Sequence, residues 1–184
     1  MSTNSKRIRT LSRLSMFLAI GIILNIVESM IPLPLPIPGV KLGLANTIGL
    51  IVLYYYGPKE YLSIGFLRVL IVGFLRTGII SIAFALSLSG WFLSSIITLV
   101  AYFFKKFSIY FLSILSATFH TIGQMIVVMI IYSTYGLIFY FPVLLITSII
   151  TGCLVAFVSA MVLQKLDKAV FKNSFKDQKE VVNE

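Results

Sequence analysis

Charged side chains are scarce in this sequence. Asp, Glu, Lys and Arg make up 11% of its 184 residues, whereas hydrophobic residues make up 59% and the mean hydropathy is +1.03. A water-soluble domain carries about a quarter charged residues, so this chain lacks the charge needed to cover a surface that faces water. The composition therefore argues against a soluble globular protein and favours one whose surface faces lipid.

Several groups that support enzyme chemistry are also missing. Cys153 is the single cysteine, which excludes a disulfide or a cysteine metal cluster within the chain. No GxxxxGK[ST] loop is present to hold nucleotide phosphates. Asp167 and Asp177 are the only aspartates, and both follow the last apolar segment, so no aspartate-rich pair can hold magnesium and diphosphate. We expect no metal, no cofactor and no enzymatic activity of the chain's own.

What the chain does contain is a series of long apolar segments. Six can be drawn, at residues 11–31, 40–56, 61–80, 82–104, 108–132 and 137–163. Helices are expected because an open sheet cannot satisfy its edge hydrogen bonds in lipid, and the segments do not alternate as barrel strands do. The predicted fold is an all-α integral membrane protein with six transmembrane helices.

The positive charge lies at the ends of the apolar part. Basic residues cluster at the start of the first segment or follow the last one: Lys6, Arg7, Arg9, Arg13, Lys165, Lys168, Lys172, Lys176 and Lys179. Such flanks are typical of cytoplasmic ends, and a nucleic-acid surface would instead need a basic patch on a water-facing fold. We therefore predict a cytoplasmic tail at 1–10, a transmembrane domain at 11–164, and a cytoplasmic tail at 165–184 that is frayed beyond Lys172.

The connections agree with an even number of spans. The proline-rich stretch at 32–39 is expected to be an outer loop, because alternate prolines lack the donors of a helix. The basic connections at 57–60 and 105–106 then fall on the cytoplasmic side. The turn near residues 78–81 is barely polar and is the weakest of the predicted boundaries.

Apart from Arg13 at the start of the first segment, five charged or histidine residues lie within the apolar segments or the proline loop, where a charge costs about 2.5–3.5 kcal/mol. They are Glu28, Lys41, Arg68, Arg76 and His120. The topology places Glu28, Lys41 and Arg76 at the outer surface and Arg68 about 12 Å deeper than Arg76. Three cations and a histidine against one carboxylate predict an anionic or polyoxygenated ligand that enters from outside.

A polar stripe runs along the fifth segment. Ser113, Ser116, His120 and Gln124 follow i, i+3, i+7, i+11 spacing and so share one helix face, with Gly123 beside them.

Purely structural roles are the alternative for these groups. Lys41 and Arg76 can snorkel to headgroups, and Glu28 can pair with Lys41. His120 and Gln124 can be an interhelical hydrogen-bonding pair.

The sequence resembles one known family along nearly all of its length apart from the tails. The residues that carry the resemblance are Glu28, Pro36, the string PGVKLGLAN at 38–46, Arg68, Arg76-Thr77-Gly78, Ser87-Leu88-Ser89-Gly90, His120, Gly123-Gln124, Tyr140, Pro142 and Gly152. The family is the Gx transporter family, long labelled heptaprenyl diphosphate synthase component I. It is similar to the S components of energy-coupling factor (ECF) transporters.

The resemblance implies a substrate-binding, multi-pass subunit of the bacterial cytoplasmic membrane. S components have six helices, bind a vitamin-like ligand near the outer face, and dock through small residues of the first helix onto a T component carried by two ATPase subunits. This implies docking by Ser15 and Ala19. It implies a ligand site made of Glu28, Lys41, Asn46, Arg68, Arg76, His120 and Gln124. The suggested cargo is a quinone or isoprenoid precursor.

Other functions stay open at this point. The chain can be a membrane accessory component of prenyl diphosphate or menaquinone synthesis, or of a flavin-based extracellular electron-transfer system. It can also be a scaffold whose polar residues make only interhelical contacts. An intramembrane serine protease using Ser89 and His120 is disfavoured, because Ser87 stands where rhomboid-type proteases have glycine.

Overall fold

The computed structural model describes the backbone of residues 3–30, 43–133 and 135–182, and the side chains of 7–30, 43–133 and 135–166 except 137. Within these residues the chain is all-helical. Six α-helices and two short elements follow one another: α1 (Thr3–Met30), α2 (Leu44–Tyr55), α3 (Pro58–Val72), the π-helical turn η1 (Gly73–Thr77), α4 (Ile82–Phe103), α5 (Ile109–Tyr132), the 3₁₀ segment η2 (Tyr135–Tyr140) and α6 (Phe141–Val182). The predicted all-α class is confirmed.

Four helices are long and apolar enough to cross a membrane. These stretches are Arg7–Met30, Ile82–Phe103, Ile109–Tyr132 and Ile138–Leu166. The other two helices each correspond to a predicted segment but are shorter. The apolar α2 has 12 residues, or about 18 Å at 1.5 Å per residue, and α3 has 15 residues before η1. The length and composition of these four helices agree with a multi-pass membrane protein.

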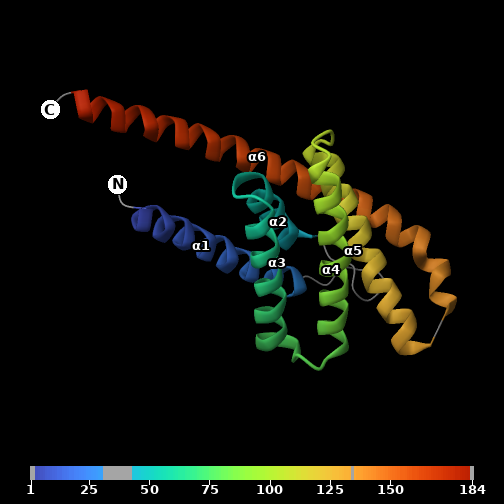
Figure 1. Ribbon diagram of the computed structural model, residues 1–184. Coiled ribbons are helices and arrows are strands. Elements are labelled where there is room, and N and C mark those ends of the chain that lie inside the picture. Colours follow the sequence, from blue (N-terminus) through green and yellow to red (C-terminus); the bar gives the residue numbers. More distant parts are fainter. Residues whose placement is uncertain (1–2, 31–42, 134, 183–184) are drawn as a thin grey trace.

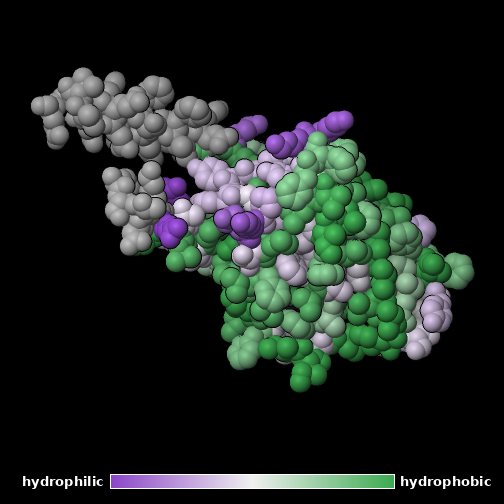
Figure 2. All heavy atoms as spheres, in the orientation of Figure 1, coloured by the Kyte–Doolittle hydropathy of each residue, from purple (hydrophilic) through white to green (hydrophobic). Residues whose placement is uncertain are grey.

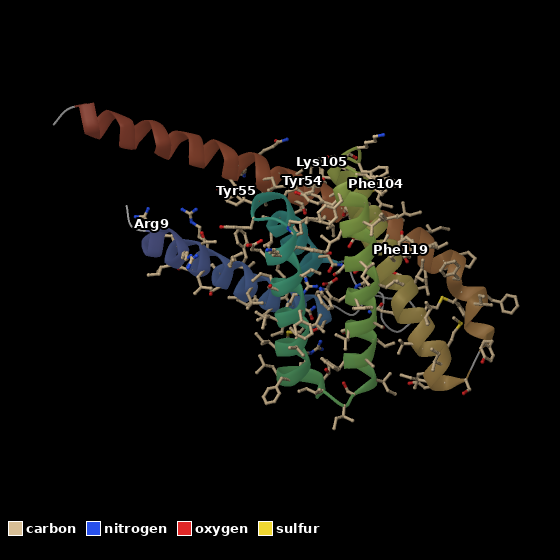
Figure 3. The ribbon with its side chains drawn as sticks, viewed as in Figure 1. Arg9, Tyr54, Tyr55, Phe104, Lys105 and Phe119 are labelled. Carbon is tan, nitrogen blue, oxygen red and sulfur yellow. The ribbon has the colours of Figure 1, made fainter. Side chains whose placement is uncertain are left out.

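The start of α1 and the end of α6 project from the same end of the bundle (Figure 1). The turns after α2 and after α4 lie at that end too, and so do Arg9, Tyr54, Tyr55 and Lys105 (Figure 3). Hydrophilic residues gather there, whereas the sides of the molecule facing the viewer in Figure 2 are mostly apolar. The turn at 78–81 and η2 lie at the opposite end. The chain therefore separates a polar end from an apolar body.

The tightest packing joins α4, α5 and α6. A Cβ atom on Gly123 of α5 would lie 2.7 Å from the carbonyl oxygen of Ser89 and 3.1 Å from Cα of Gly90, both in α4. A Cβ atom on Gly152 of α6 would lie 2.7 Å from Cα of Ile114 in α5. These glycines let the backbones approach more closely than side chains allow, so α5 is held on both sides.

The short helix α2 lies in the core. Its residues Ile51, Val52 and Leu53 are almost fully buried and cluster with Tyr61 and Ile64 of α3. Helices α1, α3 and α6 all contact α2. Because α2 begins only at Leu44, none of the described residues continues this helix beyond its N-terminal turn.

One local feature agrees with the sequence expectation and another differs from it. The barely polar turn is real: Ser81 caps α4 by accepting a hydrogen bond from the Phe84 amide at 3.1 Å, and it donates to the Gly78 carbonyl at 2.7 Å. At the other end, α6 continues as a helix to Val182, so the expectation that the chain is frayed beyond Lys172 is wrong. The segment from 165 to 182 contains neither glycine nor proline to end a helix.

Candidate functional site

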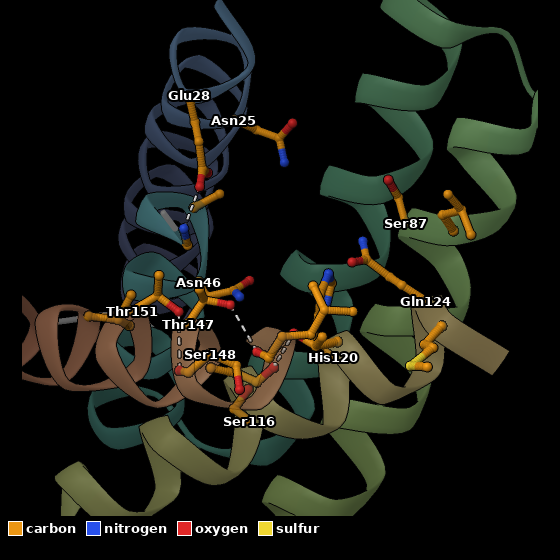
Figure 4. A pocket seen from close by; sticks show the side chains of 18 of the residues that line it. Asn25, Glu28, Asn46, Ser87, Ser116, His120, Gln124, Thr147, Ser148 and Thr151 are labelled. Carbon is orange, nitrogen blue, oxygen red and sulfur yellow. Dashed lines mark hydrogen bonds between the residues drawn. The ribbon is translucent and has the colours of Figure 1, made fainter. Parts of the chain in front are cut away.

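A cavity of about 540 Å³ lies beside the N-terminal turn of α2. Its wall contains residues of all six helices. The polar residues among them are Asn25, Glu28, Asn46, Arg68, Ser87, Ser113, Ser116, His120, Thr121, Gln124, Tyr132, Tyr140, Thr147, Ser148 and Thr151. Figure 4 shows how Glu28, Asn46, His120 and Gln124 surround one space. Apolar residues such as Leu50 and Val155 complete the wall, so the cavity offers both hydrogen-bonding groups and apolar surface.

Glu28 ties the end of α1 to the start of α2. The carboxylate is only 4% exposed and accepts a hydrogen bond from the backbone N–H of Gly43. Gly43 precedes α2 and has a φ of 78°, a left-handed conformation that glycine adopts without strain. The carboxylate therefore fixes the point at which the chain enters α2.

Arg68 reaches the same place from α3. Its side chain is 7% exposed; Nη1 donates to the carbonyl of Ala45, and Nη2 donates to Oδ1 of Asn46 at 3.2 Å. Its Nε finds no hydrogen-bond partner among the described residues. Two of the guanidinium's three nitrogens thus hold the first turn of α2, and the third is buried without a hydrogen-bond partner among the described residues.

His120 and Gln124 project from α5 across the backbone of α4. A Cβ atom on Gly90 would lie 2.8 Å from Cε1 and Nε2 of the His120 ring and 3.0 Å from Cγ of Gln124. The absence of a side chain at Gly90 therefore makes room for both. The four residues of the predicted polar stripe, Ser113, Ser116, His120 and Gln124, all line the cavity, as their spacing predicts.

The structure brings together most of the residues proposed from the sequence. Glu28, Asn46, Arg68, His120 and Gln124 line the cavity. Lys41 lies outside the described residues.

The remaining proposed residues lie elsewhere. Arg76 is not part of the cavity wall; it is exposed in η1, and its Nη2 lies 3.5 Å from the carbonyl oxygen of Ser29. Ser15 and Ala19 are exposed on α1.

Sequence reasoning missed the hydroxyl groups of α6. Thr147, Ser148 and Thr151 line the cavity, and Asn25, Ser87 and Thr121 do so from other helices. A search for costly charges passes over such residues, because small hydroxyls are common in membrane helices. The i, i+4 spacing of Thr147 and Thr151, which places both on one face of α6, is the signal that could have found them.

The charges of the cavity wall balance. Among the described residues that line it, Arg68 is the one formal cation and Glu28 the one carboxylate. No group of three or more His, Cys, Asp or Glu residues that could hold a metal ion occurs within the described part of the chain. The described part of the wall therefore offers many hydrogen-bonding groups and no net formal charge.

Comparison with known proteins gives one assignment. The family model described as heptaprenyl diphosphate synthase component I matches residues 17–162. This range covers all six helices except the N-terminal part of α1 and the C-terminal part of α6. Neither the curated proteins nor the solved structures contain a match. Since the matched region is well over half of the 184 residues, the chain belongs to the heptaprenyl diphosphate synthase component I family.

Proposed function

We propose that this protein is the ligand-binding S component of an ECF-type ATP-driven importer in the bacterial cytoplasmic membrane. The cavity carries this proposal: it has about 540 Å³ and is lined by Glu28, Asn46, Arg68, His120 and Gln124. Its volume falls within the range of pockets that hold small molecules. The proposed ligand is small and anionic, with a quinone or isoprenoid precursor as the suggested cargo.

The proposal includes six spans with both ends in the cytoplasm. The position of the ends supports it, because α1 begins and α6 ends at the same end of the bundle as the two turns that carry Lys59, Lys105 and Lys106. Positive charge is enriched on the cytoplasmic side of membrane proteins. In this orientation the cavity opens in the outer half of the membrane, where a ligand arrives from outside.

Energy for import would come from partners. The sequence has no phosphate-binding loop of its own, so a T component and two ATPase subunits are proposed to complete the transporter. Ser15 and Ala19 are exposed on α1, and small residues allow another helix to approach closely within lipid. Their exposure agrees with a docking role on this face.

Co-purification tests the proposal. The tagged chain, extracted from its own membranes, is expected to bring down a T component and ATPase subunits. Replacing Ser15 and Ala19 together by Leu is expected to abolish this, because two larger side chains keep the partner helix away. Ala83→Leu, at an exposed small residue of α4, is the matched control and is expected to leave it intact. Wild-type protein that is well folded yet brings down no ATPase subunit would contradict the proposal.

The family's description supports a second candidate. Its name refers to one component of a heptaprenyl diphosphate synthase, so the chain can be proposed as a membrane accessory of prenyl diphosphate or menaquinone synthesis. Incubation of the pure protein with allylic and homoallylic diphosphates and magnesium distinguishes the two. Elongation by the chain alone would overturn both the importer and the non-enzymatic assignment. Elongation only in the presence of a co-purified prenyltransferase would favour the accessory role.

A further inference from the structure

The two sides of the cavity carry different chemistry. The wall formed by α1, α2 and α3 contains both charged groups, Glu28 and Arg68, together with the amides of Asn25 and Asn46. The wall formed by α4, α5 and α6 contains no Asp, Glu, Lys or Arg among its described residues. Hydroxyls, an imidazole and an amide supply the polar groups there. A ligand in this space thus meets an ionic wall on one side and a neutral one on the other.

Most of the hydroxyl groups in the neutral wall already donate a hydrogen bond within the protein. Each donates it to a backbone carbonyl three or four residues earlier in its own helix, at 2.9 Å for Ser87 and Thr147 and at 3.1 Å for Thr121 and Thr151. A hydroxyl that donates in this way keeps its oxygen lone pairs as acceptors. This wall is therefore rich in hydrogen-bond acceptors, and a ligand beside it needs donors of its own.

Among the described residues, the ionic wall can receive only a limited negative charge. The charge of Arg68 is balanced by that of Glu28, and its Nη1 and Nη2 already donate to Ala45 and Asn46. Its unpartnered Nε is buried, so the donors left for a ligand are the second N–H groups of Nη1 and Nη2. Because Oδ1 of Asn46 accepts from Arg68, the NH₂ group of this amide remains a donor. These donors suit one carboxylate. A diphosphate carries several negative charges and only acceptor oxygens towards its surroundings, and it would place them against an acceptor-rich wall.

We propose that the cavity takes a small hydroxylated carboxylic acid. The carboxylate would lie towards Arg68 and Asn46, and the ligand's O–H groups would donate to the hydroxyl oxygens of Thr121, Thr147 and Thr151. This inference rests on the proposed function, since it names the ligand class of the same site. It separates two cargo classes that the sequence leaves together: carboxylic acids that bear donors, and prenyl diphosphates.

Three probes test the ligand class with the purified full chain in detergent. They are a dihydroxynaphthoic acid, its dimethoxy derivative, and geranyl diphosphate, compared by isothermal titration calorimetry. The two acids share a carboxylate and a ring system, but methylation removes the O–H donors. At about fivefold for each neutral hydrogen bond, the dihydroxy acid is expected to bind at least tenfold more tightly than its dimethoxy derivative. Equal affinity of the two acids, tighter binding of geranyl diphosphate, or binding of no probe would overturn the proposal.

Side-chain variants test the geometry. Thr147→Val and Thr151→Val remove an oxygen acceptor with little change in shape, and each is expected to weaken binding of the dihydroxy acid about fivefold. Binding of the dimethoxy acid is expected to stay unchanged. Thr98→Val is the matched control, because Thr98 is fully buried and lies outside the cavity wall. An equal loss of affinity in the Thr98 variant, or for both acids, would contradict the assigned contacts.

The importer proposal and the ligand-class proposal are contradicted by different experiments. Absence of ATPase subunits in the co-purification counts against the importer. If those subunits co-purify but geranyl diphosphate binds best, the importer stands and the hydroxylated acid is the wrong class.

Discussion

Arg68 and Arg76 lie eight positions apart, on α3 and on the η1 turn that continues it, yet they have different environments. Arg68 is buried and donates to the carbonyl of Ala45 and to Oδ1 of Asn46. Arg76 is exposed, and its recorded contact is a long one, 3.5 Å to the carbonyl oxygen of Ser29. By sequence alone, both arginines are charges that are equally costly to place within an apolar segment. Only the fold shows that one holds the first turn of α2.

Replacing each arginine by methionine separates these roles. Arg68→Met is expected to lower the free energy of unfolding by about 2 kcal/mol, since hydrogen bonds to a charged group are lost and Glu28 loses its balancing charge. Arg76→Met, the matched control, is expected to change it by less than about 0.5 kcal/mol. Thermal unfolding in detergent measures both. Equal destabilisation by the two variants would show that burial does not determine the role of Arg68.

The candidate site could be predicted from the sequence only where a residue is costly to bury. Glu28, Arg68 and His120 stand out in an apolar segment because an ionisable group in lipid requires a partner. Thr147 and Thr151 do not stand out, because a hydroxyl that donates to its own helix costs little to bury. The charged side of the cavity and the polar stripe of α5 were therefore predictable, whereas the hydroxyls of α6 were found only in the structure.

At the scale of helices, the cavity lies beside the N-terminal turn of the short α2. The sequence predicts a segment that starts at residue 40, but α2 begins at Leu44, after the left-handed Gly43 held by Glu28. Apolar composition continues across this point, so hydropathy alone cannot place the boundary. The position of the boundary depends on backbone geometry and on a contact with α1, 15 residues away in the sequence.

Helix α5 carries His120 and Gln124, and its close contacts predict how it responds to added bulk. Gly123→Ala is expected to destabilise the protein by about 1–3 kcal/mol, although alanine favours a helix by about 1 kcal/mol. The reason is that the new Cβ meets backbone atoms of α4 at 2.7 and 3.1 Å, and these cannot move without shifting the helix.

Gly136→Ala is the control for this change. A Cβ atom at Gly136 has no atom within 4 Å among those described, so unfolding temperature in detergent is expected to stay within about 1 °C of wild type. A Gly123 variant as stable as the Gly136 variant would mean that α4 and α5 are not in backbone contact.

At the scale of the whole molecule, the helical class could be predicted from hydropathy, but the number of spans could not be settled in that way. Four helices meet the length and hydropathy expected of a span. Helix α3 contains Arg68 and passes into a π-helical turn at Gly73, and α2 covers about half of a bilayer core of about 30 Å. Both are stabilised by neighbouring helices within the bundle, which composition does not show.

Cysteine labelling determines the arrangement across the membrane. Cys153 is replaced by Ala to remove the native thiol, and single cysteines are introduced at Lys59, Lys106 or Ile80. Ile80 is fully exposed in the turn between η1 and α4, whereas the two lysines lie at the end of the bundle where the chain begins and ends. With six spans and cytoplasmic ends, a membrane-impermeant maleimide added to intact cells is expected to label only Ile80→Cys. All three single-cysteine variants are expected to react with the maleimide after the cells are opened. Labelling of Lys59→Cys or Lys106→Cys in intact cells would place the basic turns outside, and the cavity would then open towards the cytoplasm and could not capture a ligand from outside.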